Sequence, residues 1–171
     1  MSRKWNISHT QEADLPRLLA IYRRARRFMA EQGNPTQWGD RWPPEALLRE
    51  DIAAGRSYVC KDESGKIIGT FCYLYGEDVD ECYRVIEDGA WSYDLPYGVV
   101  HRIASDGTPG VGTFCMRWAL GKSGYLRVDT HAANCPMQRV AAKLGMRRCG
   151  IIYVREDNEP RIAFDVKNKE A

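Results

Sequence analysis

The chain has 171 residues, of which 44% are hydrophobic and 28% are charged, and its formal net charge is +2 at neutral pH. This length and composition are typical of one globular domain with a core of its own, and the small net charge gives no support to a polyanionic partner. The sequence shows neither a signal peptide nor an apolar run of the ~18 residues that span a membrane. We therefore expect a cytoplasmic protein that binds neither nucleic acid nor membranes.

The first half of the chain predicts two helices and then a hairpin. Apolar residues recur with helical spacing from Leu15 to Met29, and the arginines of the run RRARR occupy the opposite face. A second helix is predicted over Glu45–Ala54, with Gly55 as its cap. The β-rich runs SYVCK and KIIGTFCYLY are separated by Asp62–Gly65, which predicts a β-hairpin.

The second half predicts further strands and helices. We expect DVDECYRVIEDGAW to be weakly helical and WSYDLPYG to be an aromatic loop that leads into the strand YGVVHRIAS. A glycine loop is followed by a short helix, Thr113–Leu120, with Gly121 and Gly124 as its stop. The strand YLRVDT, a helix from Asn134 to Leu144, and an antiparallel pair, CGIIYV and RIAFDV, follow. Because no repeat or linker is present, residues 1–171 are predicted to form a single mixed α/β domain.

The stretch HRIASDGTPGVGTF joins a strand to a helix through three glycines and a proline. The amides of such a loop converge at the positive end of a helix dipole, which suits a phosphate group. Glycines in a turn of this kind can also serve tight turning and close packing alone. No Lys-Ser/Thr pair follows Gly112 and the loop does not spell G-x-G-x-x-G, so neither a P-loop nor a Rossmann site is expected.

The order of parts around this loop is more specific than the loop itself. A strand, the G-V-G-T turn, a helix, a strand, an Asn-capped helix and then L-G-M before another strand resemble the GNAT superfamily of acyl-CoA-dependent N-acyltransferases, over nearly the whole chain. The resemblance implies an α/β (mixed α+β) fold, in which a mostly antiparallel sheet splays after the HRIAS strand and is flanked by about four helices.

The resemblance also implies acetyl-CoA as cosubstrate. The pantetheine arm would pair with the backbone of Ile103, Ala104 and Ser105, and the diphosphate would lie on the amides of Gly110, Val111, Gly112 and Thr113. Asn134 would cap its helix and offer its amide to the cofactor. The chain departs from the usual pattern at two positions: Gly107 stands where similar proteins carry Gln or Arg, and Ala141 stands where many carry a tyrosine that protonates the leaving thiolate.

An alkylammonium with a pKa near ~10.4 must lose a proton before it attacks a thioester, so the reaction needs a base. His101 is the predicted catalytic base, because strand alternation places it on the face of Ile103 and Ser105 and because some similar enzymes have a histidine there. A histidine that is merely hydrogen-bonded within the sheet is the alternative. Asp129 and His131 could join a proton path or form an ordinary polar strand exit.

The cysteines favour no metal and no acyl-enzyme. Six are scattered without a C-x-x-C pair, and the histidines do not cluster beside them, so we expect reduced thiols and no metal site. Cys135 has no base in the sequence, and the resemblance implies direct attack of the amine.

Five aromatic residues lie in the two segments that, by the resemblance, wall the acceptor side of the cleft: Trp38, Trp42, Trp91, Tyr93 and Tyr97. They could equally fill a core, but they favour a small amine with an apolar or aromatic body as acceptor. The expected function is transfer of an acetyl group from acetyl-CoA to a primary amine. The alternative is a non-catalytic acyl-CoA-binding or scaffold module of the same fold. A homodimer through the terminal strands or exposed helices is common among similar proteins.

Overall fold

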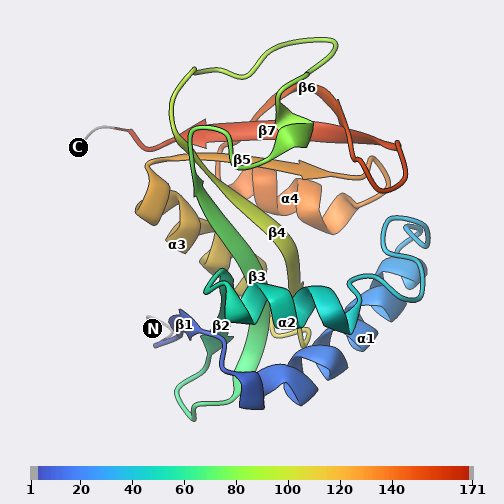
Figure 1. Cartoon of the computed structure of the whole chain (residues 1–171), viewed down its shortest axis with the longest axis vertical. Coiled ribbons are helices and arrows are strands. Elements are labelled where there is room, and N and C mark those ends of the chain that lie inside the picture. Colours follow the sequence, from blue (N-terminus) through green and yellow to red (C-terminus); the bar gives the residue numbers. More distant parts are fainter. Residues whose placement is uncertain (1–3, 170–171) are drawn as a thin grey trace. The chain divides into compact units, whose positions relative to one another are not determined.

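A computed structural model describes residues 4–169, so the two ends of the predicted 1–171 domain, residues 1–3 and 170–171, lie outside the described residues. The α-helices are α1 (Leu15–Glu31), α2 (Glu45–Ala53), α3 (Val111–Ser123) and α4 (Cys135–Lys143). The strands are β1 (Asn6–His9), β2 (Ser57–Lys61), β3 (Ile67–Gly76), β4 (Tyr97–Ser105), β5 (Tyr125–Thr130), β6 (Arg147–Tyr153) and β7 (Pro160–Lys167). Figure 1 shows these elements along the chain. Over the described residues, the mixed α/β fold with four α-helices is confirmed.

The seven strands are hydrogen-bonded in the order β1-β2-β3-β4-β5-β7-β6. The pairs β1–β2, β2–β3, β5–β7 and β6–β7 are antiparallel, whereas β4 and β5 are parallel. Among the described residues, the β4–β5 register comprises only Gly98 with Leu126 and Val99 with Arg127, although β4 continues to Ser105. The sheet is therefore open and mostly antiparallel, as predicted, and the β4–β5 ladder ends early.

The chain forms two compact units, each made of discontinuous segments. Unit 1 comprises the residues up to Tyr73 together with His101–Cys115, and unit 2 comprises Leu74–Val100 and the residues from Met116 onward. The strands β3 and β4 and the helix α3 each contribute residues to both units.

In unit 1, α1 and α2 cover one face of the strands. The apolar stripe predicted for the first helix is buried from Leu15 to Ala25, whereas Phe28 is 38% exposed and Met29 is half-buried. The buried part packs on residues from α2, β2, β3 and the end of β4. The buried residues of this core are Leu15, Leu18, Ile21, Tyr22, Ala25, Leu48, Val59, Ile67 and Ala104. The helix ends near Gly33, whose φ of 81° suits glycine.

In unit 2, the last strand in the sequence, β7, lies between β5 and β6. The core on one face of this sheet includes aromatic residues from the long segment that connects β3 to β4. Its buried members are Tyr83, Tyr97, Val99, Tyr125, Cys149, Ile152 and Ala163. Among residues 4–169, no helix combines the length and the apolar character needed to cross a bilayer.

Two sequence expectations about helices need correction. The segment DVDECYRVIEDGAW contains only a 3-10 turn, Glu81–Tyr83, because its bonds go elsewhere: Asp80 accepts from the Cys82 amide, and Glu87 forms a β-bridge with Ile151. The helix expected at Thr113–Leu120 runs over Val111–Ser123 and so includes Gly121. A single glycine costs a helix only about 1 kcal/mol, so it does not by itself end one.

The strand β1 was not expected, because three of its four residues are polar. It pairs with β2 at the edge of the sheet, and its burial pattern is almost fully exposed. An edge strand without a buried face lacks the alternation by which strands are recognised in a sequence.

Candidate functional site

The middle of β4 departs from extended geometry at Arg102, whose φ of 53° lies in the left-handed region. Side chains alternate between the two faces of a strand only while the backbone stays extended. The alternation argument that placed His101 on the face of Ile103 and Ser105 therefore does not carry across Arg102. His101 itself is half-buried on this strand, and its role as a base stays a prediction.

A buried ion cluster holds β4 at this irregular point. The Arg102 guanidinium donates from Nε and Nη2 to Asp51 Oδ2, at 3.0 and 2.7 Å. Arg56 Nε donates to the other carboxylate oxygen of Asp51 at 2.7 Å. The Asp51 side chain is 2% exposed and that of Arg102 is 14% exposed. A carboxylate so deeply buried is tolerated only because it is paired and hydrogen-bonded.

Two neighbours of this cluster are protonated donors. The Tyr22 hydroxyl donates to the Arg102 carbonyl oxygen at 2.7 Å, and burial raises the pKa of the Tyr22 phenol. Burial also raises the pKa of the Cys72 thiol, to about 11. The side chain and the carbonyl of Arg102 are thus both held, so that the backbone conformation at this point of β4 is fixed from two sides.

The glycine loop after β4 is anchored through Asp106. The Asp106 carboxylate accepts from the Thr108 amide at 3.0 Å and the Thr108 hydroxyl at 2.6 Å, and it pairs with Arg17 at 3.0 Å and Lys66 at 3.2 Å. Burial alone would raise the pKa of this carboxyl, but the hydrogen bonds from Thr108 and the charge of Lys66 hold the pKa below its usual value. The Asp106 amide donates to the Ile68 carbonyl at 2.9 Å. The loop is therefore tied to both α1 and β3.

The turn from this loop into α3 presents backbone with little side chain around it. Gly110 has a φ of 90°, which other residues rarely adopt. The Val111 side chain is only 1% exposed. Its Cγ1 packs so closely on Gly69 that a Cβ added to this glycine would lie 2.5 Å from it. The Phe114 amide makes a helical bond to the Gly110 carbonyl, whereas the first amides of a helix have no partner within it. Gly110, Val111, Gly112 and Thr113 therefore fit the diphosphate role expected from the sequence.

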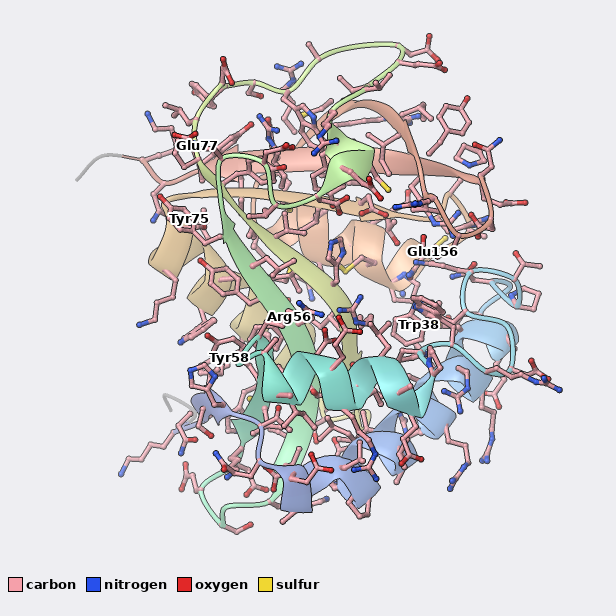
Figure 2. The ribbon with its side chains drawn as sticks, in the orientation of Figure 1. Trp38, Arg56, Tyr58, Tyr75, Glu77 and Glu156 are labelled. Atoms are coloured by element: carbon pink, nitrogen blue, oxygen red, sulfur yellow. The ribbon has the colours of Figure 1, made fainter. Side chains whose placement is uncertain are left out.

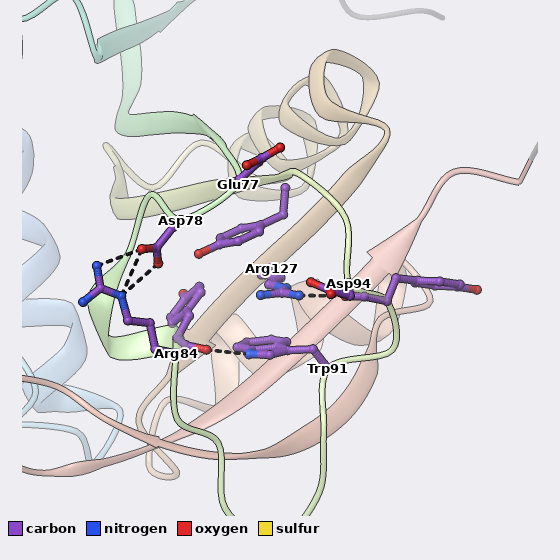
Figure 3. A pocket seen from close by; sticks show the side chains of 9 residues that line it. Glu77, Asp78, Arg84, Trp91, Asp94 and Arg127 are labelled. Carbon is purple, nitrogen blue, oxygen red and sulfur yellow. Dashed lines mark hydrogen bonds and ion pairs between the residues drawn. The ribbon is translucent and has the colours of Figure 1, made fainter.

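A cavity of about 290 Å³ lies in unit 2 (Figure 3). We call it the unit 2 pocket; it is lined by Glu77, Asp78, Tyr83, Arg84, Trp91, Tyr93, Asp94, Tyr97 and Arg127. Three of the predicted acceptor residues, Trp91, Tyr93 and Tyr97, are therefore brought together. Asp78 is paired with Arg84 at 2.8 Å. Carboxylates outnumber arginines in this lining, which favours a cationic occupant.

Arg127 organises the aromatic wall of the unit 2 pocket. Its guanidinium carbon lies 4.6 Å from the ring centre of Trp91 and 4.2 Å from that of Tyr97, and Nη2 donates to the Tyr93 carbonyl at 2.7 Å. The Trp91 indole donates to the Tyr83 carbonyl at 2.9 Å. Tyr97 is 2% exposed whereas Tyr93 is 46% exposed. Trp91 and Tyr97 therefore hold Arg127 in place, and Tyr93 is the more accessible aromatic ring.

The other two predicted acceptor aromatics lie in unit 1, in the loop between α1 and α2. Trp38, labelled in Figure 2, is half-buried. It packs edge-on against Tyr22, with ring centres 5.7 Å apart. The Trp42 carbonyl accepts from Arg26 Nη1 at 3.2 Å. Tyr22 also binds the Arg102 carbonyl, so Trp38 is connected through one residue to the irregular point of β4.

The polar residues after β5 are engaged in local structure. The Asn134 Oδ1 accepts from the Met137 amide at 3.2 Å, which confirms that Asn134 caps α4. The Asp129 carboxylate accepts from the buried Tyr83 hydroxyl at 2.6 Å, and burial raises the pKa of this phenol well above its usual value. The His131 Nδ1 accepts from the Ala133 amide at 3.0 Å. These contacts favour the structural interpretation of Asp129 and His131.

The remaining candidates contribute no further chemistry of their own. Ala141, at the position where a tyrosine was considered, is 1% exposed in α4, and Cys135 is exposed at the start of that helix. All six cysteines are free thiols. Among residues 4–169, no three His, Cys, Asp or Glu side chains lie close enough together to hold a metal ion.

Comparison with known proteins supports the fold. No family model matches the chain, and no curated protein matches it. Among solved structures, a GNAT-family acetyltransferase from Streptococcus agalactiae matches with a TM-score of 0.87 at 24% identity, and the match covers 99% of each chain. The chain has the GNAT fold.

Other proteins with the GNAT fold match at lower similarity. A GNAT-family acetyltransferase from Listeria monocytogenes has a TM-score of 0.69 at 14% identity, with 98% of this chain and 99% of that chain covered. A GNAT phosphinothricin acetyltransferase from Sinorhizobium meliloti, solved in complex with acetyl-CoA, has a TM-score of 0.61 at 16% identity, with 95% and 88% covered. At these identities the likeness establishes the fold, which the sequence resemblance had implied.

Several residues of these two sites were missed in the sequence. Asp51 could have been noticed, since it follows Leu48 by three residues on the buried side of α2, where a charged residue needs a partner. Arg127 also stands between apolar residues in YLRVDT. The sequence contained no signal that Asp51 and Arg102 meet, because 51 residues separate them.

Proposed function

We propose that the protein is an acyl-CoA-dependent N-acetyltransferase that transfers an acetyl group from acetyl-CoA to a primary amine. The observation that carries this proposal is the anchored turn from β4 into α3, in which Gly110 has a φ of 90° and the Val111 side chain is turned into the core. This arrangement leaves the first amides of α3 to a bound anion. The fold supports the same conclusion, because proteins of this fold include one solved with acetyl-CoA.

In this proposal the cofactor is held mainly by backbone. Ile103, Ala104 and Ser105, at the end of β4, offer N–H and C=O groups to the amides of the pantetheine arm. The turn that begins at Gly110 binds the diphosphate, and the Asn134 amide is a further contact. None of these roles requires a charged side chain of the turn itself.

The chemistry requires two protons to leave the ammonium nitrogen, one before the amine attacks the thioester and one after the C–N bond has formed. Acetyl-CoA supplies an activated acetyl thioester. His101 takes the proton from the ammonium group, so that the free amine can form the new C–N bond while the C–S bond breaks. Backbone N–H groups of β4 stabilise the negative charge on the carbonyl oxygen. The second proton passes from the acylated nitrogen through water to the departing thiolate, because α4 offers only the buried Ala141 at the position considered for a tyrosine.

The acceptor in this proposal is a small amine with an apolar or aromatic body. The unit 2 pocket supports this, since the half-exposed Tyr93 and the acidic residues Glu77 and Asp94 all line it. Aromatic faces and carboxylates together attract an alkylammonium group. An extended basic peptide would require a longer acidic groove than these residues offer.

One observation favours a second candidate, a non-catalytic module that binds acyl-CoA. Ala141 leaves α4 without a proton donor at that position. This candidate predicts cofactor binding without turnover on any amine.

A thiol-release assay with acetyl-CoA and a panel of amines separates the candidates. We expect thiol release with at least one small aromatic amine, and a rise in melting temperature on addition of acetyl-CoA, since a ligand at a hundredfold excess over its Kd adds about 2.7 kcal/mol. Binding without thiol release on any amine would favour the non-catalytic module. A melting temperature unmoved by both acetyl-CoA and CoA would refute the cofactor assignment.

A further inference from the structure

The turn proposed to bind the diphosphate carries no cation of its own. Between Ser105 and Val111 the residues are Asp106, Gly107, Thr108, Pro109 and Gly110, and the single charge among them is a carboxylate. Helix amides alone stabilise an anion modestly, whereas a guanidinium forms charge-assisted hydrogen bonds that are about twice as strong as neutral ones. A diphosphate at this turn therefore calls for a cation from elsewhere in the chain.

Arg24 of α1 lies over this turn. A Cβ placed on Gly107 would approach the Arg24 guanidinium to 2.1 Å at Nη2, 2.5 Å at Cζ and 2.8 Å at Nη1. The guanidinium thus occupies the space that a side chain at Gly107 would fill. The φ of Gly107 is 96°, so this position disfavours any other residue, and a charge here has to come from a neighbouring element.

Arg24 differs from the other cations near the turn. Arg17 lies two helical turns earlier on the same face of α1 and is committed to Asp106 and to the Ile67 carbonyl. Lys66 is also paired with Asp106. Within residues 4–169, Arg24 makes neither a hydrogen bond nor an ion pair, and its side chain is exposed. Arg17 and Lys66 therefore share one carboxylate, and among the described residues the charge of Arg24 is left without a counterion.

We infer that Arg24 is the side-chain ligand of the cofactor diphosphate, an inference that rests on the proposed function. The planar fork of a guanidinium matches two phosphate oxygens. This role also separates the arginines of the run RRARR. Arg26 is bonded to the Trp42 carbonyl, and Arg23 and Arg27 are exposed, whereas the Arg24 guanidinium lies beside Gly107.

The test is calorimetric titration of wild type, Arg24→Ala and Arg23→Ala with CoA and with dephospho-CoA, which lacks the 3′-phosphate but keeps the diphosphate. Arg23→Ala is the matched control, because it removes the same charge from an exposed position of the same helix. We expect Arg24→Ala to raise the Kd about tenfold for both ligands, and Arg23→Ala to change it less than about twofold. Arg24→Lys should recover part of the loss, because it keeps the charge but not the fork.

Each other outcome has a definite meaning. Equal small losses of affinity in the two alanine variants would show that Arg24 contributes only to the overall positive charge. This result would overturn the inference while the proposed function stands. If Arg24→Ala loses affinity for CoA but not for dephospho-CoA, Arg24 binds the 3′-phosphate, and its assignment to the diphosphate is overturned. Failure of the wild type to bind either ligand would overturn the proposed function together with the inference. The melting temperature without ligand should be the same in all the variants, which tests folding separately.

Discussion

The buried carboxylate of Asp51 offers the sharpest test of how β4 is held, and the substitution Asp51→Asn isolates its charge. The Asp51 oxygens accept three hydrogen bonds from guanidinium groups, at 2.7 Å from Arg56 and at 3.0 and 2.7 Å from Arg102. An asparagine has nearly the same shape, but its NH₂ group cannot accept a bond from a guanidinium. Two cations would then face one another around a neutral side chain.

The expected loss follows from burial. Removing one partner of a buried ion pair costs about 3–5 kcal/mol of the unfolding free energy. The neighbouring Glu50 provides a matched control, since it also pairs with Arg56 at 2.8 Å but is 67% exposed. Exposed pairs contribute about 0–1 kcal/mol, so Glu50→Gln should have little effect.

Urea unfolding of the three proteins at one pH measures these free energies. For a chain of this size, the Asp51→Asn loss corresponds to a fall in melting temperature of roughly 6 to 20 °C. Added salt should reduce the small Glu50→Gln effect and leave the Asp51→Asn effect nearly unchanged. If Asp51→Asn costs no more than Glu50→Gln, the cluster does not hold β4 and our account of Arg102 is wrong.

Three further changes test other parts of the molecule. His101→Ala should lower turnover by roughly 10²-fold at neutral pH while leaving the Kd of acetyl-CoA unchanged, and full turnover from pH 6 to 9 would assign His101 to structure. Tyr93→Ala should raise the Michaelis constant of the amine but not that of acetyl-CoA, with Tyr75→Ala as an exposed control on β3; equal losses for both substrates would indicate misfolding. Burial raises the pKa of the Cys72 thiol to about 11, so the stability that this thiol contributes is complete below its unfolded pKa of ~8.5 and is lost as the pH rises toward 11. When the unfolding free energy is measured at several pH values, it should fall less above pH ~9 in Cys72→Ala than in the wild type. An identical dependence of this free energy on pH in the two proteins would contradict the assignment.

The elements that were predicted from the sequence are those specified by local pattern. The apolar stripe of α1, the β2–β3 hairpin and the Asn134 cap all depend on residues a few positions apart. The strand β1 and the segment after β3 were missed or misjudged, because an exposed edge strand and a loop stabilised by distant bonds carry no such periodicity.

The candidate sites divide in the same way. The glycine turn could be found because its composition is unusual over a short stretch. The contacts of Arg24 with Gly107 and of Asp51 with Arg102 join residues that are distant in the sequence, so only the fold brings them together. The Arg102 φ of 53° could not be predicted either, because arginine has no preference for that region and is held there by its partners.

The discontinuous composition of the two units has a consequence for synthesis on the ribosome. Domains generally fold in order as they emerge. Unit 1 cannot be completed when its helices and hairpin have emerged, since it also needs His101–Cys115. In unit 2, β6 has no strand partner in its ladder until β7 emerges and inserts between β5 and β6. Nascent chains therefore expose unpaired strand edges for much of their synthesis, and protection by a chaperone should matter most before Lys167 has emerged.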